Sequence, residues 1–158
     1  MIIIRHRQNT DKDLANISTN HGAEFDIRSQ GQHLVLHHEP YEAGNRFDQW
    51  LENYNHRMLI LNVKEEGLED RVLELMKKNS IENFFFLDQS FPFLVKTSHT
   101  GESRCAVRVS EFENIDTAMS LAGKVDWVWI DCFSRFPLDK DSATQLKKAG
   151  FKLCVVSP

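Results

Sequence analysis

The sequence lacks the marks of a membrane protein, a secreted protein or a nucleic-acid-binding protein. No apolar run approaches the roughly 20 residues that a transmembrane helix needs. The N-terminal stretch MIIIRHRQNT is too briefly apolar for a signal-peptide core, and its charges follow the apolar residues instead of preceding them. The formal net charge is -4, and no long basic run offers a surface for nucleic acid or acidic lipid. These absences predict a cytoplasmic protein that binds no nucleic acid.

Cysteine is scarce, and its arrangement argues against a metal or redox site. The chain has three cysteines, Cys105, Cys132 and Cys154, which are widely spaced and form no CxxC pair. Each lies in or beside an apolar segment, as is typical of buried thiols in a reducing compartment. We therefore expect three free, buried thiols.

What the sequence does contain is a series of short apolar runs. The 158 residues are enough for one domain with a sizeable core, and we expect a single domain over residues 1–158. Most runs are four to six residues long and rich in Val, Ile, Phe and Leu, which predicts buried strands. The runs are MIII, AEFDI, HLVLHH, RMLILNVK, ENFFFLD, CAVRV, DWVWID and FKLCVV.

Helical patterns separate most of these runs. They are FDQWLENY, EEGLEDRVLELMKKN, NIDTAMSLAG, LDKDSATQLKKAG and, most weakly, QSFPFLVKTSHTG with Pro92 in its first turn. Strand and helix therefore alternate, which favours a parallel α/β sheet or barrel. One run breaks the alternation: only about six residues separate AEFDI from HLVLHH, too few for a parallel crossover. We expect that segment to be an excursion from the sheet.

Polar residues of functional types recur where the apolar runs end. They are His6, Arg7, Glu24, Asp26, His38, Asn62, Lys64, Asp88, Arg108 and Asp131. In parallel α/β barrels the active site is built at the carboxyl ends of the strands. Simpler interpretations stay open, because a strand-end aspartate commonly caps a turn, Lys64 can pair with Glu65 or Glu66, and Glu39 can form a local ion pair. Glu24 and Asp26, two residues apart in GAEFDIR, share one strand face, which is either solvated or aimed at a common interior site.

Taken in order, IIIRHRQNT, GAEFDIR and LVLHHEP resemble the glycerophosphodiester phosphodiesterases. That family has His-Arg at the end of its first strand, Glu-x-Asp on its second and His-Asp-Pro shortly afterwards. A Leu-Glu-x-Lys strand follows. The matching residues are His6-Arg7, Glu24 with Asp26, His38-Glu39-Pro40 with Glu in place of Asp, and Leu61-Asn62-Val63-Lys64. The first 64 residues carry nearly all of the resemblance.

The resemblance implies a TIM-like (β/α) barrel that hydrolyses a small-molecule phosphodiester with a divalent cation, Mg²⁺ or Ca²⁺, and a role in lipid metabolism. Two histidines suit acid–base chemistry near neutral pH, a planar guanidinium suits phosphate oxygens, and carboxylates at i and i+2 on a strand suit a hard cation. By match, the catalytic pair is His6 and His38, the phosphate is bound by Arg7 and Lys64, and the metal ligands are Glu24 and Asp26, with Asn62 and Asp131 as further candidates.

The sequence also departs from the family pattern. Asn62 stands where the family has its third metal carboxylate, and Gln8 stands where a glycine usually follows His-Arg. FKLCVVSP counts as the seventh barrel strand, so we expect the last β/α unit to be absent, and a homo-oligomer would cover the open edges. Two alternatives follow: a catalytically degenerate barrel that binds a phosphorylated ligand or a protein partner, or an unrelated α/β enzyme such as a sugar-phosphate isomerase or lyase.

Overall fold

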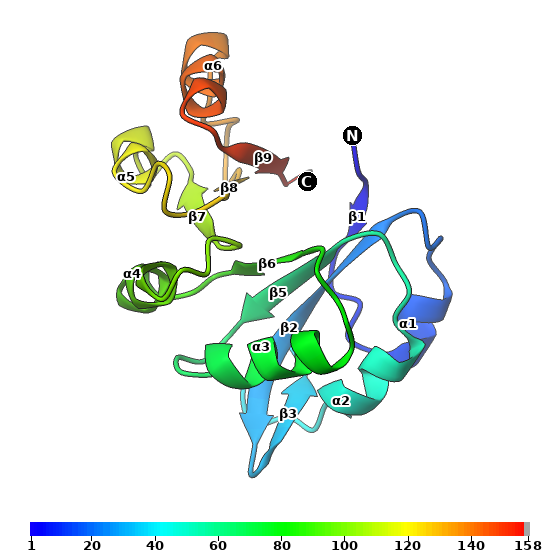
Figure 1. The fold of residues 1–158 in the computed structure, drawn as a ribbon. Coiled ribbons are helices and arrows are strands. Elements are labelled where there is room, and N and C mark those ends of the chain that lie inside the picture. The colour runs from blue at the N-terminus through cyan, green and yellow to red at the C-terminus, as the bar shows by residue number, and fades with distance from the viewer. Residues whose placement is uncertain (157–158) are drawn as a thin grey trace. The chain divides into compact units, whose positions relative to one another are not determined.

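The computed structural model describes residues 1–156, which divide into two compact units, Met1–Gln89 and a second that begins at Ser90. Each unit is built on its own sheet with helices beside it (Figure 1). The predicted α/β class with parallel strands is therefore confirmed. The strands of residues 1–156 lie in one six-stranded and one three-stranded sheet, and these do not make a closed barrel.

The first unit contains a mixed sheet whose central strands are parallel. Its strands are β1 (Ile4–Arg5), β2 (Gly22–Gln30), β3 (His33–Leu36), β4 (Asn45–Arg46), β5 (Leu59–Val63) and β6 (Phe84–Leu87). Strands β1 and β5 pair with β2 in parallel, and β6 pairs with β5 in parallel. Strand β3 returns antiparallel to the end of β2, and β4 pairs with β3. The hairpin of β2 and β3 is the excursion that the short spacing predicted.

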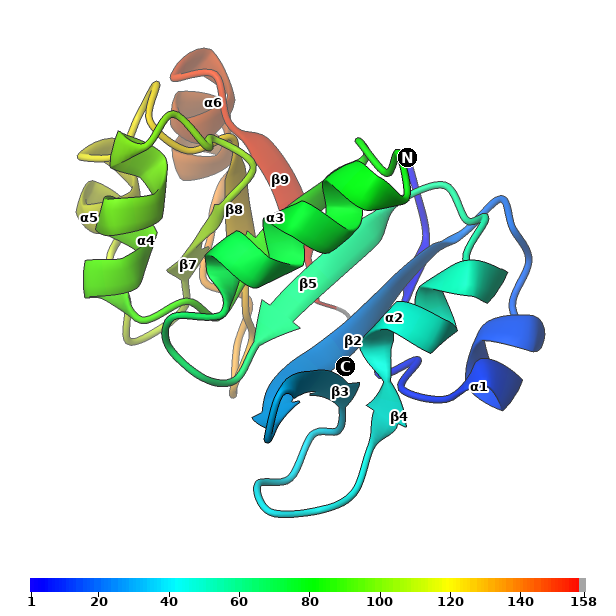
Figure 2. The ribbon, with the colours of Figure 1, turned by 60° about the horizontal axis from the view of Figure 1, so that its bottom comes forward.

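Four short helices complete this unit. They are α1 (Asp11–Ala15), α2 (Phe47–Trp50), the 3₁₀ helix η1 (Leu51–Asn53) and α3 (Glu69–Lys78). Helices α2 and α3 lie on the same side of β2 and β5 (Figures 1 and 2). On that side the ring of Phe25 packs 4.9 Å from Phe47 and 4.7 Å from Trp50, between ring centroids. Because side chains alternate along a strand, Glu24 and Asp26 point away from this aromatic core.

The second unit repeats a helix-then-strand order around a parallel sheet. Its elements are α4 (Phe91–His99), β7 (Ala106–Val109), α5 (Ile115–Met119), β8 (Trp127–Ile130), α6 (Lys140–Lys148) and β9 (Lys152–Val155). The three strands pair in the order β7, β8, β9. The most weakly predicted helix, α4, is nine residues long with Pro92 in its first turn, where a proline needs no hydrogen-bond donor.

Two expectations need correction, and one segment was missed. The run MIII forms strand only at Ile4–Arg5, and Cys105 is buried while Cys132 and Cys154 are partly exposed free thiols. Helix α1 was not predicted, although Thr10 and Asp13 form a capping box at its start. No helix within residues 1–156 is both long and apolar enough to cross a membrane.

Candidate functional site

Parallel pairing of β2 and β5 brings three polar side chains to one face of the first sheet. Asp26 lies opposite Asn62 in the register, and Glu24 lies opposite Ile60. Because residues opposite each other in a parallel pair point to the same face, Asn62 lies beside both acids. Glu24 is 0% exposed, Asp26 1% and Asn62 4%. The acids of GAEFDIR therefore do not form a solvated strand face.

Glu24 is held by groups from β5 and from the chain after β1. Its Oε2 accepts the main-chain N–H of Arg7 at 2.7 Å, and its Oε1 accepts the Asn62 amide at 2.8 Å. The His6 Nε2 lies 3.5 Å from the same Oε2. Burial raises the pKa of Glu24 above its ordinary value, and His6 and the hydrogen bonds oppose that rise. Glu24 is thus a buried carboxyl group at a meeting point of polar side chains.

Asp26 is fixed by Asn9, a residue that the sequence did not single out. The Asn9 amide donates to Asp26 Oδ2 at 2.9 Å, and its carbonyl oxygen accepts the Asp26 main-chain N–H at 2.9 Å. Asn9 lies two residues after Arg7 in the sequence. Its closeness to the His-Arg motif is the signal that could have identified it. These two hydrogen bonds fix the positions of both the main chain and the carboxylate of Asp26.

Lys64 lies between the carboxylate of Asp26, in the middle of β2, and the carboxylate of Asp88, which directly follows β6. Its Nζ is 3.3 Å from Asp26 Oδ1 and 3.1 Å from Asp88 Oδ2, and its side chain is only 17% exposed. Glu65, one of the two neighbouring glutamates that could pair with Lys64, lies 3.7 Å from the Arg28 guanidinium. Lys64 therefore brings positive charge to the side chains of Glu24, Asp26 and Asn62, which together form the acid cluster.

Arg7 connects the acid cluster to His38. Its main-chain N–H reaches Glu24, and its Nη2 lies 3.1 Å from His38 Nε2. The other ring nitrogen, Nδ1, lies 2.6 Å from Glu39 Oε1. Arg7 has a φ of 54°, in the left-handed region where non-glycine residues are uncommon. The structure thus brings His6, Arg7, Glu24 and His38 into one continuous set of contacts.

Asp131 and Arg108, the remaining strand-end residues, belong to the second unit. Asp131 Oδ1 accepts the main-chain N–H of Cys132 at 3.1 Å, and its Oδ2 lies 3.7 Å from Arg108 Nη1. These contacts match the simpler interpretation, in which Asp131 holds its own loop. A metal-ligand role for Asp131 stays a prediction.

The oxygen atoms of the acid cluster suit a hard cation. Within residues 1–156, the buried Oδ1 atoms of Asp26 and Asn62 have no hydrogen-bond partner, although Lys64 faces the former. Carboxylate and amide oxygens are the ligands that Mg²⁺ and Ca²⁺ prefer. No three His, Cys, Asp or Glu side chains of the described residues gather as a metal site, so Asn62 would complete the set with Glu24 and Asp26.

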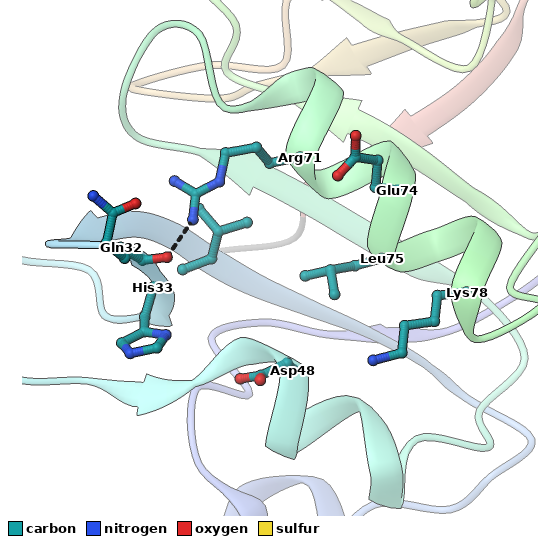
Figure 3. Close-up of a pocket in the computed structure, with 8 residues that line it drawn as sticks. Gln32, His33, Asp48, Arg71, Glu74, Leu75 and Lys78 are labelled. Carbon is teal, nitrogen blue, oxygen red and sulfur yellow. Dashed lines mark hydrogen bonds between the residues drawn. The ribbon is translucent and has the colours of Figure 1, made fainter.

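A separate pocket of about 260 Å³ lies beside α2, α3 and the turn between β2 and β3 (Figure 3). Arg71 donates a 2.8 Å hydrogen bond to the Gln32 carbonyl across it. Two basic and two acidic side chains with fixed charge line it, so the pocket offers no excess of either sign. The lining residues are Gln32, His33, Leu34, Asp48, Arg71, Glu74, Leu75 and Lys78. None of the predicted site residues is among them.

The fold is similar to solved structures of glycerophosphodiester phosphodiesterases. The enzyme from Agrobacterium tumefaciens strain C58 matches 98% of this chain and 85% of its own, with a TM-score of 0.70 and 15% identity. A provisionally assigned glycerophosphodiester phosphodiesterase from Galdieria sulphuraria matches 99% of this chain and 93% of its own, with a TM-score of 0.52 and 13% identity. No family model and no curated protein matches the sequence. The resemblance predicted from the motifs is therefore confirmed at the level of the fold.

Proposed function

We propose that the protein is a phosphodiester hydrolase of the glycerophosphodiester phosphodiesterase type, dependent on Mg²⁺ or Ca²⁺. The observation that carries the proposal is the set of contacts from His6 through Glu24 and Arg7 to His38. Two histidines, a guanidinium and a buried carboxylate in contact with one another are the groups that phosphodiester cleavage needs. The similar fold of two glycerophosphodiester phosphodiesterase structures supports the same substrate class.

In the proposed reaction a hydroxyl group attacks phosphorus, a new P–O bond forms and the P–O bond to the leaving alcohol breaks. One histidine of the pair His6 and His38 takes the proton of the attacking hydroxyl, and the other gives a proton to the leaving oxygen. The Arg7 guanidinium and the Lys64 ammonium would balance the charge of the phosphoryl oxygens.

The cation would be held by Glu24, Asp26 and Asn62, whose oxygen atoms suit Mg²⁺ or Ca²⁺. When bound, it supplies Lewis-acid polarisation of a phosphoryl oxygen. The two hydrogen bonds with Asn9 would position Asp26 for this role. Asp131 remains a further candidate ligand.

The proposal includes the finer points of fold and context that the sequence predicts. They are a TIM-like barrel, a single domain over residues 1–158, a small-molecule substrate, a cytoplasmic location and a homo-oligomer.

A second candidate function is favoured by one observation. Lys64 is already ion-paired to Asp26 at 3.3 Å, and Asn62 carries no charge, so the cluster is partly neutralised without a cation. A degenerate barrel of this kind would bind a phosphorylated ligand through Arg7 and Lys64 without hydrolysing it.

One assay separates the two functions. The protein is incubated with glycerophosphodiesters and with a chromogenic aryl phosphodiester, in Mg²⁺, Ca²⁺ or Mn²⁺. Cation-dependent turnover should fall by about 10²- to 10⁴-fold in His6→Ala and in Glu24→Ala. The exposed residues His99 and Glu66 provide matched controls, since their alanine variants should keep full turnover. Absence of turnover with every cation, together with phosphate binding by calorimetry, would refute the hydrolase and favour the degenerate barrel.

A further inference from the structure

The hydrogen bonds around His38 determine which of its ring nitrogens carries a proton. The Arg7 guanidinium has donors and no acceptor, so the His38 Nε2 that lies 3.1 Å from Arg7 Nη2 has to accept. The Glu39 carboxylate accepts, so the His38 Nδ1 that lies 2.6 Å from Glu39 Oε1 has to donate. Both contacts are satisfied at once only by the neutral tautomer with its proton on Nδ1.

We propose that Glu39 is a positioning residue that holds His38 as the Nδ1–H tautomer, so that Nε2 carries no proton and can accept one. If the proposed hydrolysis holds, His38 is then the base of the histidine pair. The proton of the attacking hydroxyl moves to Nε2 as the new P–O bond forms. The resulting imidazolium donates from Nδ1 to the Glu39 carboxylate, which balances its charge.

Neighbouring contacts hold the main chain at His37 and His38 in place. The Arg28 guanidinium donates two hydrogen bonds, at 3.1 and 2.9 Å, to the main-chain carbonyl of His38. The main-chain N–H of His37 donates to the Asp26 carbonyl at 3.0 Å, which ties this segment to β2. The hydrogen bond from His38 lowers the pKa of Glu39, so that the carboxylate stays an acceptor near neutral pH.

The same geometry gives Arg7 a second effect. Its guanidinium covers the Nε2 lone pair of His38 while no anion is bound. A phosphoryl group that draws the guanidinium onto its own oxygen atoms uncovers that lone pair. Binding of the phosphate would thereby release the base.

Nitrogen NMR tests the tautomer without any need for turnover. The protein is labelled with ¹⁵N in its histidine rings and measured at about pH 8.5, about two units above the ordinary histidine pKa. The His38 signals are assigned by their loss in His38→Ala. We expect a protonated Nδ1 and an unprotonated Nε2 in the wild type. A proton on Nε2 would overturn the proposal.

Three variants test whether Glu39 sets that tautomer. Glu39→Ala should shift His38 towards a mixture of tautomers, while Glu39→Gln should keep the Nδ1 proton because its amide oxygen still accepts. Glu42 is exposed, so Glu42→Ala provides an equal loss of charge and should leave the spectrum unchanged. An unchanged tautomer in Glu39→Ala would refute the positioning role.

Two further readouts separate this inference from the proposed function. Inorganic phosphate should shift the His38 Nε2 signal in the wild type but not in Arg7→Gln, and an equal shift in both would refute the covering by Arg7. In a hydrolytically active protein, Glu39→Ala should lower kcat/KM about tenfold, with Glu39→Gln in between. An inactive protein with the Nδ1–H tautomer would refute the hydrolase and leave the hold of Glu39 on His38 intact.

Discussion

Replacing Asn62 by glutamate tests the proposed cation ligands most sharply. Asn62 stands on β5 beside both acids of β2, and its amide donates to Glu24 Oε1 at 2.8 Å. Asn62→Glu removes that hydrogen-bond donor. It also adds a third carboxylate at the position where the glycerophosphodiester phosphodiesterase pattern has one. Asn62→Gln adds the same length without the charge and is the matched control.

The cost without a cation follows from the geometry. Two carboxylates about 2.8 Å apart repel by about 6 kcal/mol at an effective dielectric constant of about 20. At roughly 1.4 kcal/mol for each unit of pKa shift, this repulsion would raise the pKa of one of the two carboxyl groups by about four units, so the pair would take up a proton instead of carrying both charges. The lost hydrogen bond to a charged acceptor adds about 1.5 to 3 kcal/mol. In a chelator we expect Asn62→Glu to unfold with about 3 kcal/mol less free energy than the wild type.

A divalent cation should reverse this order. An added carboxylate raises the charge of the ligand set, so we expect Asn62→Glu to bind Mg²⁺ or Ca²⁺ at least about tenfold more tightly than Asn62→Gln. At 100 times the dissociation constant, binding to the folded state restores about 2.7 kcal/mol. Titration calorimetry and denaturant unfolding with and without Ca²⁺ measure both effects. Equal affinity of the two variants would show that residue 62 does not face the cation, and the proposed ligand set would be wrong.

Three further changes give separate expectations. Burial raises the pKa of Glu24, so in a chelator the wild type should lose stability as the pH rises through that pKa, whereas Glu24→Gln should show a smaller loss in pH-dependent melting; parallel melting curves would contradict this. Asn9→Ala removes two hydrogen bonds to Asp26 and should lower the free energy of unfolding, measured in urea, by about 2 to 4 kcal/mol. A change below about 1 kcal/mol would show that these hydrogen bonds do not stabilise the fold. Gly44→Ala would place a Cβ 2.5 Å from the Leu36 carbonyl oxygen and should lower the free energy of unfolding by about 1 to 3 kcal/mol in the same measurement. An unchanged free energy of unfolding would show that Gly44 does not lie so close to Leu36.

The strands could be predicted because buried strands have a simple signature. Short runs of Val, Ile, Phe and Leu between polar segments identified β5 and β6, which are fully buried, and β2, whose first six residues are buried. Helix α1 was missed because it has only five residues and one buried side chain, Leu14. So short a segment has no helical period to detect.

The residue types of the candidate site could be predicted, but their partners could not. Alternation along β2 placed Glu24 and Asp26 on one face, and the motif order indicated His6 and His38. The hydrogen bonds of Asn9 and the approach of Arg7 to His38 depend on the loop after β1, where Arg7 adopts a left-handed conformation. No local sequence signal favours that conformation for arginine. Strand ends are thus easier to predict than the loops that join their side chains.

Phosphorus NMR of a glycerophosphodiester tests the central claim most directly. The protein is incubated with the diester in Mg²⁺ or Ca²⁺, in a chelator, and as Glu24→Gln. The account predicts that the diester signal converts to a phosphomonoester signal only in the wild type with a divalent cation. Conversion in the chelator, or no conversion with any cation, would contradict it.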